Sequence, residues 1–455
     1  MNSEVTRPGT VTHLGFVGED RPALSDLQNC IHCGFCLPVC PTYVATGQEL
    51  ESPRGRLHLI RSVLEGRADT SGALLAHLDL CLQCRACETA CPSSVPYGRI
   101  MEDARASTMA RGVARRPLSW TLRAAFLRHV VARPQVIRAL FALGRAYTRS
   151  GLQRQIRGPW RDAVPPSLRA IEARAPVLDQ SRYGRTGTLA RPEQPRTRVA
   201  LLLGCVQGDL YPNVHEATVR VLKRLGCEVI APAGQACCGA LHTHAGDASA
   251  ARALARRNIE AFEAAGVDAI IVNAAGCGAA MKEYGRLLRH DDAWRQRAER
   301  LAASVRDVIE FVALQPLGGG LGDLDIDVTV QDACHLAHAQ GIREAPRAIL
   351  RAIPGLRLHE MRTPDRCCGG AGLYTLVQRE MSQQVLDAKL EDIAGTEATV
   401  IVTSNPGCTL QIEGGLVASG RPAVVRHVIE LLDDAYRAGD VSRSRPATWS
   451  STATR

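Results

Sequence analysis

The sequence predicts an α+β multidomain protein in which a helical N-terminal domain precedes two related α/β repeats. Its 455 residues, 45% of them hydrophobic, exceed one typical domain. Near the N-terminus a four-cysteine pattern occurs twice, and the residues between the copies repeat their apolar positions at helical spacing. Further along, a longer pattern of strand, helix and Cys-Cys-Gly turn also occurs twice. Because strands that alternate with helices form parallel sheets, each long repeat is predicted to be one small α/β unit.

The composition limits the class of protein. No window of about 18 consecutive apolar residues is present, and the opening MNSEVTRPGT lacks the charged and apolar segments of a signal peptide. We therefore expect a cytoplasmic protein without a membrane span. The 17 cysteines of such a chain indicate metal or redox chemistry, because disulfide scaffolds belong to small exported domains.

Changes in composition and periodicity divide the chain into five segments. The predicted boundaries are 20–103 for the helical domain, 104–196 for a basic helical connector, 197–315 for the first repeat, 326–435 for the second and 436–455 for a tail. The tail is rich in Ser, Arg and Thr, and we expect it to be disordered because it has too few apolar residues to pack.

The first part of the connector is strongly basic. Residues 104–161 hold thirteen Arg and no Asp or Glu, interleaved with apolar residues. This pattern predicts amphipathic helices that dock on anionic lipid or on an acidic partner, or that simply pack on their own protein. Nucleic acid is not expected as a partner, because no helix-turn-helix or RNA-binding signature accompanies the charge.

Each copy of the four-cysteine pattern reads C-x2-C-x2-C-x3-C-P, from Cys30 to Pro41 and from Cys81 to Pro92. Soft thiolates suit iron, and this is the spacing of ferredoxins with two 4Fe-4S clusters, in which the fourth cysteine binds the other cluster. One cluster is therefore assigned to Cys30, Cys33, Cys36 and Cys91, and the other to Cys81, Cys84, Cys87 and Cys40. Two zinc sites are the alternative. The helical domain is thus predicted to be ferredoxin-like and to carry electrons.

The long repeats carry four cysteines each. They are Cys205, Cys237, Cys238 and Cys277 in the first repeat, and Cys334, Cys367, Cys368 and Cys408 in the second. All are expected at strand ends or on the turns that follow, which is the edge where open α/β sheets bind ligands. Each set is a candidate for a further cluster or metal, with Gly239 and Gly369 permitting a tight turn. Buried apolar cysteines, a zinc site and a redox-active dithiol remain open for both sets.

Five other residues near these sets have less specific roles. Cys227 lies outside both sets and is predicted to be a core residue. His242, His244, His335 and His338 follow the cysteine turns, where they could tune a redox potential, move protons or serve as ordinary polar residues.

Taken in order, these motifs resemble the glycolate oxidase (glycolate dehydrogenase) iron-sulfur subunit family. The resemblance covers residues 25–435 and includes both cysteine motifs, SPRGR at 52–56, GCGAAMKEYG at 276–285 and both Cys-Cys-Gly turns. The third subunit of anaerobic glycerol-3-phosphate dehydrogenase and the CCG subunits of heterodisulfide reductases share these parts. The resemblance implies a helical two-cluster ferredoxin domain followed by two α/β CCG repeats, which we expect to be related by a pseudo-twofold axis.

The resemblance also implies a function in a complex. Separate FAD-binding subunits oxidise glycolate to glyoxylate, and this chain passes the electrons towards a quinone, with the complex peripheral on the inner face of the membrane. No G-x-G-x-x-G opens a βαβ unit here, so we expect no flavin site and no catalytic residue on this chain.

In heterodisulfide reductases the last cysteine of a CCG set is part of C-x-x-C. Ala280 and Gln411 stand in that place here, so only the two ferredoxin-type clusters carry over from the resemblance. The alternatives for function are the equivalent subunit of a lactate or glycerol-3-phosphate dehydrogenase, and a redox sensor that responds to cluster loss.

Overall fold

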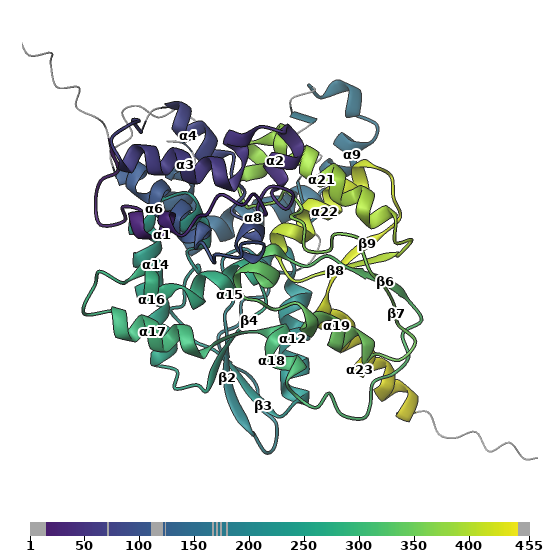
Figure 1. Ribbon diagram of the computed structural model, residues 1–455. Coiled ribbons are helices and arrows are strands. Elements are labelled where there is room, and N and C mark those ends of the chain that lie inside the picture. Colours follow the sequence, from purple (N-terminus) through teal and green to yellow (C-terminus); the bar gives the residue numbers. More distant parts are fainter. Residues whose placement is uncertain are drawn as a thin grey trace, which may run out of the picture.

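The chain folds into a helical N-terminal domain and two α/β repeats that pack against each other (Figure 1). The computed structural model describes residues 15–70, 72–110, 122, 124–165, 168–169, 172, 175–178 and 181–444. In Figure 1 the purple N-terminal helices lie at the upper left, the first repeat lies below them and the second repeat lies to the right.

The N-terminal domain is built from short helices around one apolar core. They are α1 (Leu24–Gln28), α2 (Pro41–Thr46), η1 (Glu49–Glu51), α3 (Pro53–Leu64), α4 (Gly72–Asp79), α5 (Ala86–Thr89) and α6 (Tyr97–Ala110). Leu57 and Ile60 of α3 pack with Ile100 and Met101 of α6, and all four are buried. Cysteines of both motifs border this core. The helices therefore hold the two cysteine loops on one rigid body.

The described part of the connector contains helices and one strand. Its elements are η3 (Leu127–Val131), α8 (Pro134–Arg149), α9 (Leu152–Arg157), η4 (Arg161–Ala163) and β1 (Gly187–Ala190). Leu127, Val131 and Ile137 are buried against the first repeat. The missed strand β1 has only four residues, too few for a readable alternation. Connector residues 111–121 and 123 lie outside the described residues.

The first repeat contains a five-stranded sheet of order β1-β3-β2-β4-β5. Its strands after β1 are β2 (Thr197–Leu201), β3 (Cys227–Ala231), β4 (Ala269–Val272) and β5 (Val305–Asp307). Its helices are α11 (Gln207–Leu210), α12 (Pro212–Arg224), α13 (Ala240–His244), α14 (Ala248–Glu263), α15 (Ala275–Lys282), α16 (Tyr284–Leu287), α17 (Arg295–Ser304) and α18 (Val308–Ala313). Strands β2 to β5 pair in parallel, whereas β1 pairs antiparallel with β3.

The second repeat has the same strand order without the extra edge strand, β7-β6-β8-β9, and every pair is parallel. Its strands are β6 (Asp327–Val330), β7 (Arg357–His359), β8 (Val400–Thr403) and β9 (Val424–His427). Its helices are η5 (His335–Ala339), α19 (Glu344–Arg351), α20 (Tyr374–Val377), α21 (Arg379–Ala394), α22 (Pro406–Ala418) and α23 (Val428–Ser444). The fourth strand of each repeat, β5 and β9, was not predicted.

The two repeats pack reciprocally. Helix α12, which follows the first strand of repeat one, packs on α23, which follows the last strand of repeat two. The equivalent helix α19 of repeat two packs on α18 of repeat one. One apolar core with members such as Leu222, Val308, Leu350 and Leu432 runs through both units. This reciprocity is what a pseudo-twofold relation requires, and the predicted fold class is confirmed.

The prediction of a disordered tail from residue 436 is wrong for residues 436–444, because α23 continues to Ser444. Tyr436 is buried, its hydroxyl donates to the Leu317 carbonyl at 2.5 Å, and the Arg224 guanidinium lies 4.5 Å from its ring centroid. Arg224 also pairs with Asp440. These contacts with repeat one hold the last turns of a segment whose composition alone favours disorder. Residues 445–455 lie outside the described residues.

Within the described part of the chain, no helix combines the length and the apolar character needed to cross a membrane.

Candidate iron-sulfur centres

The structure gathers the first predicted set around one cavity. Cys30, Cys33, Cys36 and Cys91 line it together with apolar residues that include Leu57 and Tyr97. Cys33 is exposed, and the other three thiols are partly buried. The Val95 amide donates to Cys91 Sγ at 3.4 Å. Four thiols and an apolar wall are what a cubane needs, so the residues present fit the group.

The second predicted set is buried. Cys81, Cys84, Cys87 and Cys40 are all shielded from solvent, and the Cys87 thiol has the other three as its electrostatic neighbours. Cys81 Sγ accepts two hydrogen bonds, one from the Gln83 amide at 3.4 Å and one from the Tyr97 hydroxyl at 3.6 Å. Burial raises the pKa of the Cys84 and Cys87 thiols well above the usual range. Thiolate formation here therefore depends on the charge of a bound metal. The crossed assignment of ligands stays a prediction that this arrangement supports.

The two cysteine loops share an unusual backbone conformation. His32 and Gly34 have φ of 57° and 85°, and the equivalent Gln83 and Arg85 have φ of 53° and 61°. Left-handed residues that are not glycine cost about 1 kcal/mol or more each. Their repetition at matching positions indicates that the loops are wound for ligand binding, since winding of this kind turns backbone amides towards the enclosed sulfur atoms.

The SPRGR segment holds the first cysteine motif at two places, at His32 and near Cys40. Ser52 caps α3 by accepting from the Gly55 amide at 2.9 Å, and a Cβ on Gly55 would collide with the Glu49 carbonyl. Arg54 donates to the His32 carbonyl at 3.0 Å, inside the first loop. The fully buried Arg56 donates to the Glu51 carbonyl at 2.6 Å. The same carbonyl also accepts from the Cys40 thiol.

In the first repeat the four candidate cysteines converge at the sheet edge. Cys237 Sγ lies 3.5 Å from Cys205 Sγ, and Cys238 Sγ lies 3.0 Å from Cys277 Sγ. The Tyr284 hydroxyl donates to the Cys238 carbonyl at 2.9 Å, and Asn258 Nδ2 donates to the Cys237 carbonyl at 3.0 Å.

Tyr284 explains one end of the GCGAAMKEYG motif, because it holds the Cys-Cys-Gly turn. Asn258 was missed by sequence reasoning. It sits on the apolar face of α14, and no spacing links it to a cysteine.

The second repeat repeats this arrangement. Its thiols interact in a chain, Cys334 with Cys367, Cys367 with Cys368 and Cys368 with Cys408. Here the turn is held by a different residue, because Ser382 Oγ donates to the Gly369 carbonyl at 3.0 Å. The buried Lys389 donates to the Thr363 carbonyl, in the segment before the turn, at 2.6 Å.

Both turn glycines, Gly239 and Gly369, have positive φ, a conformation that glycine adopts without strain. The second is further constrained, because a Cβ on Gly369 would approach the Ser382 carbonyl to 2.6 Å.

The last cysteine of each set is not at a strand end, which corrects the prediction. Cys277 is the third residue of α15 and Cys408 the third residue of α22. Strands β4 and β8 end five residues before Cys277 and Cys408. The last residues of the segments VDAIIVNAAGC and ATVIVTSNPGC therefore belong to the following helices and not to the strands.

The residues at the diverged positions make their own contacts. Gln411 Nε2 donates to Ser382 Oγ at 3.1 Å, so it braces the second turn. Ala280 lines a pocket beside Cys238. Cys227 lies in β3 within the apolar core, as predicted.

The four histidines divide into two pairs. The His244 and His335 rings lie 5.1 Å apart, between the two repeats, and His335 Nδ1 is 3.5 Å from Cys334 Sγ. His242 contacts the Leu127 carbonyl through Nε2 at 3.1 Å, and His338 contacts Thr89 of the N-terminal domain at 2.9 Å. The structure thus places His335 beside Cys334 and His242 beside Cys237, whereas His338 joins the second repeat to the N-terminal domain.

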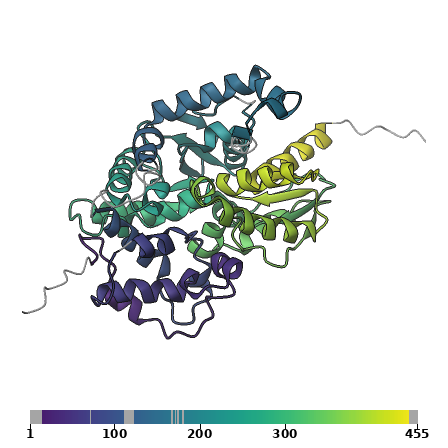
Figure 2. The same ribbon diagram turned by 90° about the horizontal axis from the view of Figure 1, so that it is seen from above.

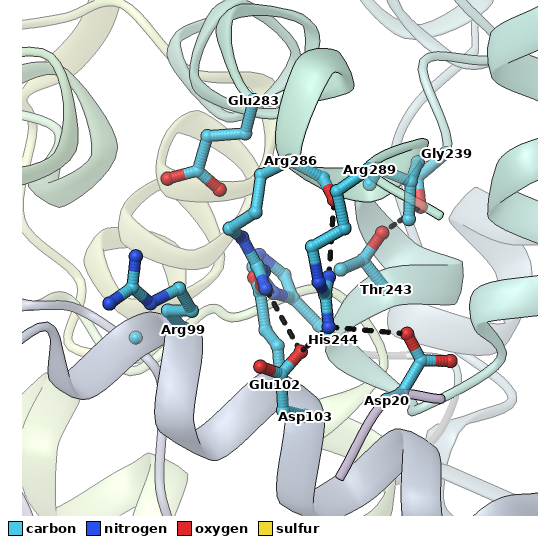
Figure 3. A network of polar contacts seen from close by, with 12 residues as sticks. Asp20, Arg99, Glu102, Asp103, Gly239, Thr243, His244, Glu283, Arg286 and Arg289 are labelled. Atoms are coloured by element: carbon cyan, nitrogen blue, oxygen red, sulfur yellow. Dashed lines mark hydrogen bonds and ion pairs between the residues drawn. The ribbon is translucent and has the colours of Figure 1, made fainter. Parts of the chain in front are cut away.

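A network of ion pairs joins α6 to the first repeat, and the sequence did not predict it (Figure 3). Glu102 pairs with Arg286 and Arg85, and Asp103 accepts from Arg286 and Arg289 at 3.0 and 3.2 Å. Arg85, which follows Cys84 directly, also forms a two-pronged pair with Glu283 at 2.5 and 2.9 Å. The ion pairs hold the Glu102 pKa well below its usual range against the effect of burial.

No three His, Cys, Asp or Glu side chains of the described residues meet the geometry of a single bound metal ion. What the described residues do provide is four sets of four thiols, two on the N-terminal domain and one in each repeat.

Comparison with known protein families assigns the same parts. Residues 26–95 match the 4Fe-4S dicluster domain, and residues 199–282 and 328–413 each match the cysteine-rich domain of CCG type. The first match implies two 4Fe-4S clusters on the N-terminal domain.

Comparison with individual proteins gives relatives along nearly the whole chain. The probable glycolate oxidase iron-sulfur subunit of Bacillus subtilis is 38% identical over 92% of this chain and 96% of its own length. The glycolate oxidase iron-sulfur subunit of Escherichia coli is 36% identical over 90% of this chain and 94% of its own. The lactate utilization protein A of Bacillus licheniformis is 31% identical over 52% of this chain and 99% of its own.

Proposed function

The chain belongs to the family of glycolate oxidase iron-sulfur subunits, and we propose that it is the electron-carrying subunit of a complex whose separate FAD-binding subunits oxidise glycolate to glyoxylate. The single observation that best supports an electron-transfer role is the pairing of an exposed cysteine set with a buried one on the same small domain. Cys33 of the first set reaches the surface, whereas the second set is enclosed between the N-terminal domain and the repeats.

The chain's residues would hold the clusters and keep water away from them. Clusters bound at these cysteines supply one-electron transfer, with potentials set by burial and by hydrogen bonds to sulfur. Leu82, Cys84 and Ala86 pack directly against Cys367 and Tyr374 of the second repeat. This dry contact between a ferredoxin-type loop and a CCG set supports a route for electrons from the N-terminal domain into the repeats.

The proposed substrate follows the relatives that match along the whole chain. Oxidation of glycolate to glyoxylate releases two electrons and two protons, so a two-electron flavin must hand electrons singly to a chain of this kind. The match to lactate utilization protein A favours lactate as the second candidate substrate, although that relative covers only 52% of this chain.

We also propose a cytoplasmic location with peripheral attachment to an anionic membrane through α8, where a quinone could accept the electrons. Val136, Leu140 and Leu143 form an exposed apolar stripe on α8, and Arg133 and Arg138 beside it are exposed. An apolar stripe with flanking Arg is suited to the lipid interface. Figure 2 shows α8, in blue, across the repeats from the purple N-terminal domain.

The experiment that tests the proposed function is anaerobic purification with the co-expressed flavin subunits, followed by electron paramagnetic resonance before and after glycolate. Signals of reduced 4Fe-4S clusters that appear with glycolate are the expected result. If dithionite reduces the clusters and glycolate does not, the substrate is wrong. Addition of L-lactate to the same sample then tests the second candidate.

The ligand assignment is tested by Cys36→Ser, which should lower iron and acid-labile sulfide by about half and destabilise the N-terminal domain, because metal binding is coupled to folding. Cys227→Ala is the matched control, since this cysteine lies in β3 away from every set. Zinc without sulfide in the wild-type protein would refute the cluster assignment. Sedimentation with anionic vesicles, using Leu143→Glu for comparison, tests the membrane attachment.

A further inference from the structure

The two cysteine loops differ at two matched positions. Ile31 and Phe35 of the first loop are exposed, with 67% and 62% of their surface accessible. The residues at the same places in the second loop, Leu82 and Ala86, are 5% and 7% exposed. The loops are otherwise alike in spacing and in their left-handed residues. The difference therefore lies in what covers each loop.

The cover of the second loop is the second repeat itself. Leu82 and Ala86 form one apolar cluster with Tyr374, Met381 and Val385, and Cys334 and Cys367 belong to the same cluster. The second loop is thus in apolar contact with the cysteine set of the second repeat. The chain contains its own example of how such a loop is used.

The apolar residues of the first loop are not needed to hold it in shape. Arg54 fixes the loop from below through the His32 carbonyl and is itself paired with Glu49 at 2.7 Å. Ile31, Phe35 and Cys33 between them are all exposed to solvent. An exposed aromatic residue beside an exposed metal-binding thiol is costly to keep without a partner, and aromatic residues are enriched at protein interfaces.

We propose that the surface formed by Ile31, Cys33 and Phe35 is the docking surface for the electron-donating flavin subunit. This inference rests on the proposed function, because it takes the partner to be a flavoprotein. The partner should bring an apolar patch that covers Phe35 as Tyr374 and Met381 cover Ala86. Contact there places the donor beside Cys33, the exposed thiol of the first set.

The test uses the holoprotein and the purified flavin subunits. Phe35→Glu and Ile31→Arg should each weaken complex formation about tenfold or more, measured by titration calorimetry, because a central apolar anchor typically carries that much binding energy. Hydrogen exchange should show protection of residues 31–36 in the wild-type complex. Iron content and the dithionite-reduced resonance spectrum of each variant should match the wild type.

Leu314→Glu is the matched control. Leu314 is 77% exposed, lies after α18 in the first repeat, and should tolerate the same change without effect on binding. If Phe35→Glu lowers the iron content, Phe35→Ala keeps the loop free of new charge and is measured in its place.

Unchanged affinity in iron-replete loop variants, or exchange protection confined to other surfaces, would overturn the docking proposal. So would loop-dependent binding of anionic vesicles with no effect on the flavin subunits. The outcome for the proposed function is separate. Failure of glycolate to reduce the wild-type clusters in a complex that still forms through Phe35 would reject the substrate and leave the docking surface standing.

Discussion

The N-terminal domain contacts the two repeats through surfaces of opposite character. Towards the first repeat it presents charge: Glu102 and Asp103 face Arg286 and Arg289 (Figure 3), and Arg105 donates to the His244 carbonyl at 2.7 Å. Towards the second it presents Leu82, Cys84 and Ala86, which pack on the cluster around Tyr374 and Met381. Two repeats with the same strand order are thus used differently by the same domain.

The contrast separates orientation from insulation. Buried ion pairs contribute little net stability, because desolvation of the charges offsets their attraction, but they tolerate only one arrangement. The apolar contact excludes water from the space between Cys84 and Cys334, which are close enough for the charge on one to raise the pKa of the other. The first interface fixes how the domain sits, and the second keeps the neighbouring thiol sets dry.

The largest effect is expected from breaking the charged interface. Glu102→Gln leaves Arg286 and Arg85 without their shared buried carboxylate and should destabilise the protein by about 3–5 kcal/mol. Urea unfolding of the holoprotein measures it. Glu263→Gln removes a carboxylate from an exposed pair with Arg297 and should cost less than about 1 kcal/mol. Equal effects of the two changes would show that the network does not behave as a buried one.

The sequence identified the thiol sets but not the residues that orient them. Cys84 could be assigned because ligand spacing is local, whereas no sequence pattern indicated a role for the adjacent Arg85. Its partners Glu283 and Glu102 are distant in the chain, and only the fold brings them together. The same limit hid Asn258 and Lys389, because their neighbours in sequence do not indicate that they donate to the carbonyls of Cys237 and Thr363.

The ends of some elements could not be predicted from the sequence either, because a short strand depends on its neighbour. Strand β5 has three residues and β1 has four, and each exists because an adjacent strand offers hydrogen-bonding partners. Helix α23 outlasts its predicted end because Tyr436 and Asp440 contact the other repeat. Repetition within the chain, in contrast, was readable and gave the two-repeat fold.

The repeats also differ in the residue that caps their last helix. Asp307 and His427 begin the matched segments DVIE and HVIE, and each accepts from the amide two residues later, at 2.9 and 3.1 Å. Burial raises the pKa of Asp307 to about 7, and burial lowers the pKa of His427 to about 3. Lys282 and Glu310 interact electrostatically with Asp307, whereas the Glu430 carboxylate accepts from the His427 amide at 2.8 Å and the buried His215 lies near the His427 ring.

The caps should therefore give opposite pH dependences. Between about pH 4 and 7 folded Asp307 keeps a proton that the unfolded chain loses, so its contribution to stability falls as pH rises. Between about pH 3 and 6.5 unfolded His427 takes up a proton that the folded chain refuses, so its contribution rises with pH. Each effect has an upper bound of roughly 4–5 kcal/mol.

Two Asn variants separate these contributions, because Asn retains a capping acceptor. Stability of Asp307→Asn should climb more steeply than wild type from pH 4 to 6.5, and stability of His427→Asn should decline relative to wild type over the same range. Chemical unfolding at four or five pH values provides the measurement. Parallel curves for wild type and both variants would contradict the assigned protonation states.

The apolar interface should respond more mildly than the charged one. Met381→Ala removes a buried side chain at the edge of the Leu82 and Ala86 cluster and should cost about 2 kcal/mol, at the low end for such truncations. It should also speed hydrogen exchange of residues 82–86 while residues 99–105 on α6 keep their protection. Val377→Ala, on the partly exposed neighbouring helix α20, is the control. Uniform loss of protection on both sides would mean that the two interfaces open together.

The smallest effect is expected where the repeats meet each other at the surface. Arg224 and Asp440 pair at 2.7 Å between α12 and α23, with both side chains in contact with water. Asp440→Asn should cost less than about 1 kcal/mol, and the difference should vanish at high salt, because exposed ion pairs are weak and screened. Arg224 keeps its place over the Tyr436 ring in this variant, so the change isolates the charge. A larger, salt-independent loss would mean that the end of α23 depends on this pair rather than on Tyr436, and the contact between the repeats would then resemble the charged interface of the N-terminal domain.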